Sequence, residues 1–243
     1  MRLKNKIMDK YNIQARIYPV IIGFFPIIAL GLCYTFEFKS TLHFLSSIEI
    51  TGVLVFLFSQ LGRDMGKKKE KDLWRKWNGC PSVQLLRLRD NSIDVITKNR
   101  YHQKLNGICP VPKVPTFNME KTHPEKADDV YVAWTRHLIS QTRDPRKFSL
   151  LFKENISYGF RRNLWGIKNF SIILILACLV GNYLFWMFRW RTYSPSMYPV
   201  SFLYSTVLLL FILLFWLLII RSHWIRPVAF SYAERLLEAT EQL

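Results

Sequence analysis

The sequence predicts an all-α membrane protein, with four transmembrane helices arranged as two hairpins that flank a mainly helical cytosolic domain. Half of the 243 residues are hydrophobic, and they are concentrated in four runs instead of being spread along the chain. Each run approaches the roughly 20 residues needed to cross about 30 Å of hydrocarbon. The four runs are residues 17–36, 42–61, 170–188 and 200–220.

The positions of Lys and Arg predict the orientation of these helices. With the N-terminus inside, 31 of the 34 Lys and Arg residues lie in cytosolic segments, and only Lys39, Arg189 and Arg191 lie outside. This asymmetry is typical of inner-membrane proteins, and it accounts for much of the net charge of +17. The predicted parts are a basic cytosolic N-terminus (1–16), a first hairpin (17–61), a cytosolic domain (62–168), a second hairpin (169–221) and a cytosolic C-terminal amphipathic helix (222–243).

The N-terminal part leads into a tight hairpin. Residues 1–16 are basic, with apolar residues spaced for a short amphipathic helix on an anionic leaflet, and a disordered lead-in is the alternative. Pro19 and Pro26 predict a kink in the inner half of the first span, unless Pro19 lies in its first turn. Residues 37–41 are too few for anything but a tight antiparallel connection to the second span.

The polar middle of the chain reads as a series of helices. The second span is expected to continue to about Trp77 and to stop at Asn78-Gly79-Cys80-Pro81, since Gly or Asn followed by Pro ends helices. Short helices are expected at 82–89 and 92–105, followed by an extended Pro-rich loop at 109–115.

Three further helical patterns follow. A helix is expected to begin near Pro124 and to carry an apolar stripe of Tyr131, Trp134, Leu138 and Ile139. Residues 148–164 form an amphipathic helix that leads into the third span; it lies on the membrane or, as we favour, packs against that stripe. From Phe230 the chain resumes an amphipathic pattern, which is too short to be stable without a partner surface.

Motifs for catalysis or metal binding are not found. The sequence has no P-loop, no GxSxG, no HExxH and no pair of histidines at ligand spacing. Its four cysteines form no CxxC pair, and no Cys and His cluster has zinc spacing. We therefore expect a protein that is not an enzyme and that takes neither a metal nor a cofactor.

A set of basic residues forms the first candidate site. Lipid headgroup contact is the simplest interpretation, because several members lie next to predicted spans. The alternative is a pocket for an anionic ligand such as a nucleotide, or a nucleic-acid surface, although no aromatic-interleaved RNA motif supports the latter. The set consists of Arg63, Lys67, Lys68, Lys69, Arg100, His102, Arg143, Arg161 and Arg162.

The second candidate site is a polar layer within the predicted spans. Glu49, Asn182 and Ser205 lie about six to eight residues from the outer ends of their spans, which places them at similar depths, given a rise of about 1.5 Å per residue. A carboxylate within a span usually faces protein or water. Glu49 therefore either serves a water-accessible path or an oligomer axis, or acts as hydrogen-bonded structural glue.

Three stretches resemble a group of uncharacterised bacterial four-transmembrane proteins of the inner membrane. They are Gly62-Arg63-Asp64-Met65-Gly66-Lys67, Lys98-Asn99-Arg100-Tyr101-His102 and Glu154-Asn155-Ile156-Ser157-Tyr158-Gly159-Phe160-Arg161-Arg162-Asn163-Leu164-Trp165-Gly166. The resemblance implies a location in the bacterial inner (plasma) membrane and carries no activity. In architecture alone, the chain is also similar to four-span membrane effectors of anti-phage systems.

From these features we expect a homo-oligomer that acts as a membrane-perturbing effector, channel or membrane sensor, with the cytosolic domain receiving the signal. The expected partners are a bilayer with anionic headgroups, further copies of the chain and a cytosolic protein. The alternative is a non-catalytic anchor that recruits a cytosolic partner, and a lipid-linked enzyme comes third.

Overall fold

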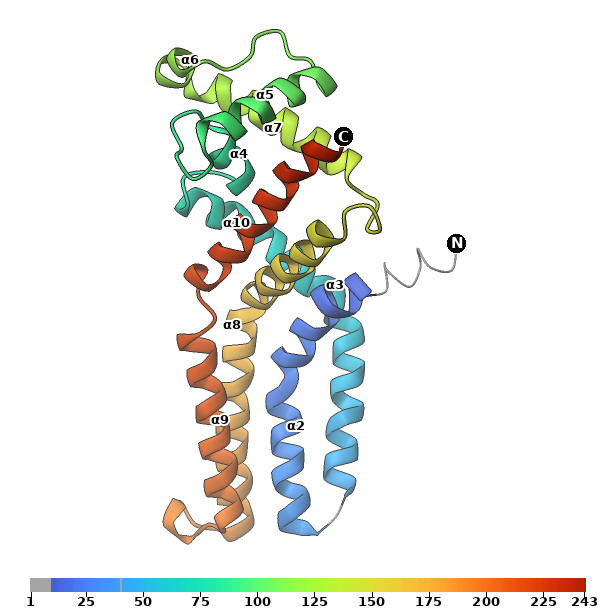
Figure 1. Ribbon diagram of the computed structural model, residues 1–243. Coiled ribbons are helices and arrows are strands. Elements are labelled where there is room, and N and C mark those ends of the chain that lie inside the picture. Colours follow the sequence, from blue (N-terminus) through green and yellow to red (C-terminus); the bar gives the residue numbers. More distant parts are fainter. Residues whose placement is uncertain (1–9, 40) are drawn as a thin grey trace. The chain divides into compact units, whose positions relative to one another are not determined.

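The computed structural model describes residues 10–39 and 41–243, and within that part of the chain the regular structure is entirely helical (Figure 1). The predicted all-α class is therefore confirmed. Residues 1–9, which belong to the predicted N-terminal amphipathic segment, and Ser40 in the first hairpin lie outside the described residues. The α-helices are α2 (Tyr18–Phe38), α3 (Leu42–Lys76), α4 (Pro81–Leu86), α5 (Val95–Ile108), α6 (Phe117–Thr122), α7 (Pro124–Gln141), α8 (Ser149–Trp190), α9 (Val200–Leu218) and α10 (Ser222–Glu238).

In the described part of the chain, three helical segments are long and apolar enough to cross a membrane: Lys10–Phe38, Ser149–Trp190 and Val200–Leu218. A fourth is added if Phe44–Ser59 and Gly62–Leu86, bent by 50° at their junction, count as one span. These segments overlap the four runs that the sequence predicts, and the ends of two runs differ by two residues. Their length and composition are compatible with a multi-pass membrane protein.

The chain divides into two compact units, each built from two stretches of sequence. Of the described residues, unit 1 comprises 10–39, 41–69 and 159–224, and unit 2 comprises 70–158 and 225–243. Unit 1 holds α2, α9, most of α3 and the apolar part of α8. Unit 2 holds α4 to α7 and nearly all of α10.

The core of unit 1 joins α2, α8 and α9. Ala29 of α2, Ile175 of α8 and Trp216 of α9 belong to one buried cluster, and Met65 of α3 packs against it. Phe24, Phe58 and Phe170 add ring contacts between α2, α3 and α8 at 5.2 to 5.3 Å between ring centroids. In Figure 1 these four helices run side by side.

The start of α2 departs from a regular helix. Residues Ile13–Ile17 form a π-helical turn, η1, in which the Tyr18 N–H donates to the carbonyl of Ile13. Pro19 lies in the first turn of α2, directly after η1, and Pro26 lies inside the helix. Neither proline has an N–H to donate to the helical ladder. Lys39, with φ of 49°, ends α2 in the left-handed conformation, as a tight connection to Leu42 requires.

The long α3 stops where the sequence predicts. Asn78 and Gly79 adopt φ of 68° and 132°, and the Gly79 N–H donates to the carbonyl of Trp74 at 2.7 Å. This six-to-one bond is the Schellman arrangement that ends helices. A glycine at this position avoids the steric cost that any Cβ would meet at positive φ.

The short helices of unit 2 differ from the predicted ranges. α4 ends at Leu86 instead of 89, because the backbone N–H groups of Leu88 and Arg89 bond the Glu120 carboxylate instead of helical carbonyls. α5 begins at Val95 instead of 92, since the Asp94 carboxylate caps it by accepting from the Thr97 N–H. α6, which was not predicted, is capped in the same way by Thr116. The chain between α5 and α6 is loop, as its prolines predict.

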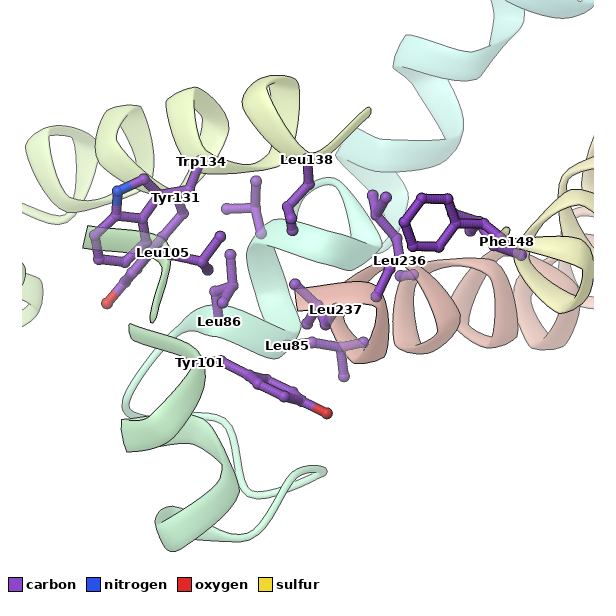
Figure 2. Packing of buried hydrophobic residues seen from close by; sticks show 14 of the residues in the cluster. Leu85, Leu86, Tyr101, Leu105, Tyr131, Trp134, Leu138, Phe148, Leu236 and Leu237 are labelled. Carbon is purple, nitrogen blue, oxygen red and sulfur yellow. The ribbon is translucent and has the colours of Figure 1, made fainter. Parts of the chain in front are cut away.

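Unit 2 has a single buried core, seen in Figure 2. Tyr131, Trp134 and Leu138 of α7 lie in it, which confirms most of the predicted stripe, whereas Ile139 is 42% exposed because it follows Leu138 by 100° around the helix. Leu151 of α8 and Phe148, just before α8, belong to the same cluster, so the start of α8 packs against the stripe as favoured. Ala233, Leu236 and Leu237 of α10 also belong to this core, so the C-terminal helix finds there the partner surface that it was expected to need.

Candidate functional site

A polar cluster joins α2, α8 and α9 among their apolar side chains. The Asn182 carbonyl accepts from the Tyr34 hydroxyl at 2.9 Å, and its amide donates to Ser205 at 2.9 Å and to Thr206 at 3.1 Å. Asn182 and Ser205, two members of the predicted polar layer, are thus brought together, and each residue is only 1% exposed. Such interhelical hydrogen bonds hold apolar helices together, at about 1 kcal/mol each.

Glu49 does not join this cluster, which corrects the predicted three-residue layer. Ser47 and Thr51 take the buried side of α3, and Glu49, two residues from each, points to the opposite, exposed side. Leu45, Val53 and Phe56 share that exposed side, Phe56 being 81% exposed. Residues at the same depth along their helices meet only if they also lie on facing sides, and depth alone does not specify the side on which Glu49 lies.

Helices α3 and α8 cross closely at two glycines, Gly66 and Gly166. A Cβ added at Gly166 would lie 2.6 Å from the backbone nitrogen of Gly66 and 2.7 Å from its Cα. A Cβ at Gly66 would in turn lie 3.1 Å from the Cα of Asn163. Two of the stretches that resemble the bacterial membrane proteins, 62–67 and 154–166, therefore meet here backbone to backbone.

Asn163 ties this crossing to the π-helical turn. Its side chain is fully buried, and its amide nitrogen donates to the carbonyl of Ala15 at 2.7 Å. Gly159, one turn earlier on α8, lets Ala15 and Tyr11 approach, since an added Cβ would lie 3.2 Å from each of them. A π-turn frees backbone groups from the regular ladder, and Asn163 satisfies one of them.

Six of the nine predicted basic residues lie in unit 1. Arg63 pairs with the neighbouring Asp64 at 3.1 Å, Lys67 and Lys68 are exposed, and the Lys69 ammonium lies 5.2 Å from the ring centroid of Trp165. Arg161 donates to the carbonyl of Trp224 at 2.7 Å and lies over that tryptophan's ring. Arg162 is buried beside Asn163, so it is not part of an exposed basic surface.

The remaining three, Arg100, His102 and Arg143, lie in unit 2 and do not form one surface there. His102 is buried, and its Nε2 donates to the carbonyl of Leu86 at 2.8 Å. Arg100 is exposed but pairs with the carboxylate of Glu241 at 2.7 Å, and Arg143 is also exposed. Arg100 and His102 diverge because residues two apart on a helix face different sides.

Sequence reasoning missed a buried network of ionisable side chains in unit 2. Glu120, 4% exposed, accepts from the N–H groups of Leu88 and Arg89 at 2.6 and 3.2 Å and from the Tyr131 hydroxyl at 2.7 Å. Arg87 forms a two-pronged pair with Asp128, at 2.9 and 2.6 Å. The Lys98 ammonium donates to the carbonyl of Arg87 at 2.9 Å and also to that of Asp90.

The electrostatics of this network follow from burial. Burial lowers the pKa values of His102 and Lys98, and it raises the pKa of Tyr131, whose hydroxyl is kept protonated as a donor to Glu120. The hydrogen bonds that Arg87 donates to the Asp128 carboxylate raise the pKa of Arg87. These groups hold the backbone of residues 86–90 in place. Lys98 and His102 share one face of α5 with the buried Tyr101 and Leu105. This three- and four-residue spacing is the sequence signal from which the burial of Lys98 and His102 could have been predicted.

Within the described residues, no group of three or more His, Cys, Asp or Glu side chains is close enough to hold a metal ion. All four cysteines are free thiols. Comparison of the chain with protein-family models, with curated proteins and with solved structures finds no match. Function is therefore inferred from this chain's own residues.

Proposed function

We propose that the chain is a multi-pass protein of the bacterial inner membrane, with four spans in two hairpins and with both termini and unit 2 in the cytosol. The distribution of Lys and Arg supports this orientation. The two ends of the helices in unit 1 differ in the same sense. Arg16, Arg161 and Arg221 lie at the end where Gly66 meets Asn163, and aromatic residues gather at the opposite end. That aromatic end includes Tyr34, Phe38, Phe185, Trp186, Tyr198 and Phe202.

Cysteine labelling in intact cells tests this topology. With the four native cysteines replaced, Ser194→Cys is expected to react with a membrane-impermeant thiol reagent, and Asn118→Cys is expected to react only after the cells are opened. Both side chains are exposed, so accessibility within the fold does not bias the comparison. The reverse labelling pattern would rule out the proposed orientation.

We further propose that copies of the chain associate through the exposed face of α3 that carries Glu49. The single observation that carries the functional proposal is that Glu49 is exposed on α3. A carboxylate exposed at membrane depth costs several kcal/mol unless it faces protein or water. Gly52, one turn beyond Glu49, has nothing within 4 Å of an added Cβ, so this part of the face is open to a close neighbour. A second copy placed there would remove Glu49 from lipid.

Such an assembly places carboxylates around a shared path or axis within the bilayer. The function that this supports best is a membrane-perturbing effector, channel or membrane sensor, with unit 2 receiving the signal. In bacteria, a role in anti-phage defence would fit an effector of this kind. The trigger would act on unit 2, and its effect would be read as depolarisation or arrested growth.

Replacement of Glu49 separates a role in this path from a role as glue. Glu49→Gln keeps the shape and a hydrogen-bonding group but removes the charge, so we expect depolarisation of expressing cells to fall while the oligomer persists. Glu49→Leu also removes the hydrogen bonds and should weaken assembly by about 1 kcal/mol. The measurements are membrane potential by a dye and the oligomer by cross-linking.

Two matched controls accompany this test. Glu37→Gln removes the same charge at the hairpin connection and is expected to leave both readouts unchanged. Gly52→Cys, on the Glu49 face, should form a disulfide-linked dimer in a cysteine-free background, whereas Thr51→Cys, on the buried face, should not. A fully active Glu49→Gln protein, together with no cross-link at position 52, would refute the proposal.

A membrane anchor for a soluble protein is the second candidate, and one observation in unit 2 favours it. Val95 and Ile96, at the start of α5, are 67% and 78% exposed, and adjacent exposed apolar residues are a common feature of docking surfaces. An anchor should neither depolarise cells nor slow growth on its own. It should retain a cytosolic protein through purification, and Val95→Ser with Ile96→Ser should release that protein.

A further inference from the structure

Two basic side chains converge on the end of α9. The Lys168 ammonium, from α8, lies 2.7 Å from the carbonyl oxygen of Ile220 and 3.5 Å from that of Leu217. The Arg221 Nε lies 3.1 Å from the same Leu217 oxygen. Two cations therefore share one carbonyl, which brings their charges close together.

A third cation approaches from α3. The Lys69 ammonium lies 5.2 Å from the centroid of the Trp165 ring. Trp165 and Lys168 are three residues apart on α8, so they occupy neighbouring positions on one face of that helix. Lys69 of α3 thus lies at Trp165 on the same stretch of α8 as Lys168, and Arg221, in the connection between α9 and α10, shares a carbonyl with Lys168. Lys168 and Arg221 remain at least partly accessible to solvent.

The positive charge of this cluster is not balanced within the described part of unit 1. The acidic side chains there are Glu37, Glu49 and Asp64. Asp64 pairs with Arg63. Glu37 lies in the last turn of α2, and Glu49 lies 20 residues before Lys69 in α3. The carbonyls at the end of α9 offset only part of the charge, because a helix C-terminus carries about half a negative charge.

A phosphate group is the anion that this arrangement suits. Arg presents a planar fork to phosphate oxygens, Lys presents a mobile point charge, and both favour charge-assisted hydrogen bonds. Tryptophan is typical of the membrane boundary, where one edge of the ring meets lipid and the N–H meets water. The cluster lies where α9, a candidate span, ends.

We propose that Lys69, Lys168 and Arg221, with Trp165, form a binding site for a phosphate group, supplied by the headgroup of an anionic phospholipid. This proposal rests on the membrane placement proposed above. The same chemistry would accept free phosphate, which is the second source to be tested. Lys69, Trp165, Lys168 and Arg221 all belong to unit 1.

The test uses the full-length protein purified in a neutral detergent and placed in nanodiscs of phosphatidylcholine with a small fraction of phosphatidylglycerol. Phosphatidylglycerol retained after delipidation is counted by native mass spectrometry. Lys168→Gln and Arg221→Gln are each expected to lower its apparent affinity about fivefold, the effect of one basic side chain near an anionic surface. Lys168→Arg keeps the charge and should bind as the original protein does.

The matched control is Lys67→Gln, which removes the same charge from an exposed position two residues before Lys69. It should leave retention of phosphatidylglycerol unchanged. Equal losses in Lys67→Gln and Lys168→Gln would reduce the effect to general surface attraction and overturn the proposal. The absence of any preference for phosphatidylglycerol would also overturn it, unless inorganic phosphate binds and is lost in the same two variants.

Inorganic phosphate therefore forms the second arm. Displacement of phosphatidylglycerol by millimolar phosphate, or binding of phosphate in detergent without lipid, would identify free phosphate as the ligand of this site. Membrane insertion, measured by resistance to alkaline extraction, is a separate readout. Failure of the original protein to insert would refute the proposed membrane placement, whereas the detergent arm would still decide on the phosphate site.

Discussion

Replacing Gly166 by alanine is expected to disrupt the packing of α3 against α8. The new Cβ would lie 2.6 Å from a backbone nitrogen and 2.7 Å from a Cα of Gly66, and backbone atoms cannot move aside as a flexible side chain can. Overpacking in well-packed interiors costs about 1 to 3 kcal/mol, and we expect the upper end or beyond it. Thermal unfolding of the full-length protein in detergent, followed by circular dichroism, measures the loss.

Gly181→Ala is the matched control on the same helix. Nothing lies within 4 Å of a Cβ added there, and alanine favours a helix over glycine by about 1 kcal/mol. The Gly181 variant should therefore unfold at the same temperature as the original protein or higher. Equal melting temperatures for the Gly166 and Gly181 variants would contradict the backbone contact between α3 and α8.

Replacing Glu120 by alanine is expected to destabilise unit 2 by about 3 kcal/mol or more. Three donors, the N–H groups of Leu88 and Arg89 and the hydroxyl of Tyr131, would lose their acceptor, and each unsatisfied buried donor costs about 1 to 3 kcal/mol. Hydrogen exchange of the full-length protein measures this locally. Amide exchange in α4 and in residues 87–90 should accelerate, while exchange in α9 should not.

Two variants define the origin of that loss. Glu125→Ala removes an exposed carboxylate from the first turn of α7 and should change exchange by little. Tyr131→Phe removes one of the three donors, so Glu120→Ala should cost less in a Tyr131→Phe background than in the original protein. Additive effects of the two changes would indicate that the Tyr131 hydroxyl does not depend on Glu120.

Elements set by local sequence were predicted well. The stop of α3 follows from Asn78 and Gly79, because only such residues adopt positive φ at little cost. The apolar stripe of α7 follows from helical periodicity, and its error at Ile139 is one position at the edge of the stripe. The helix α4 was predicted, but its end was wrong because Glu120, more than 30 residues further along the chain, accepts from the N–H groups that would have continued the helix.

The candidate sites were predicted less well than the helices. Asn182 and Ser205 share a depth and do meet, but depth alone could not show that Glu49 faces the other way from Ser47 and Thr51. Residue type alone placed Arg100 and His102 in one basic set. The fold pairs the first with Glu241 and buries the second, because their side chains leave α5 in different directions.

The amino-acid sequence by itself determined the helical class, the apolar segments long enough to cross a membrane and the end of α3, since composition, periodicity and backbone preference act over short stretches. Only the tertiary structure decided which faces meet. The contact of Gly66 with Gly166, the bond from Asn163 to Ala15 and the convergence of Lys69, Lys168 and Arg221 each join segments distant in sequence. Such contacts depend on how side chains of several helices fit together, and no local pattern in the chain records that fit.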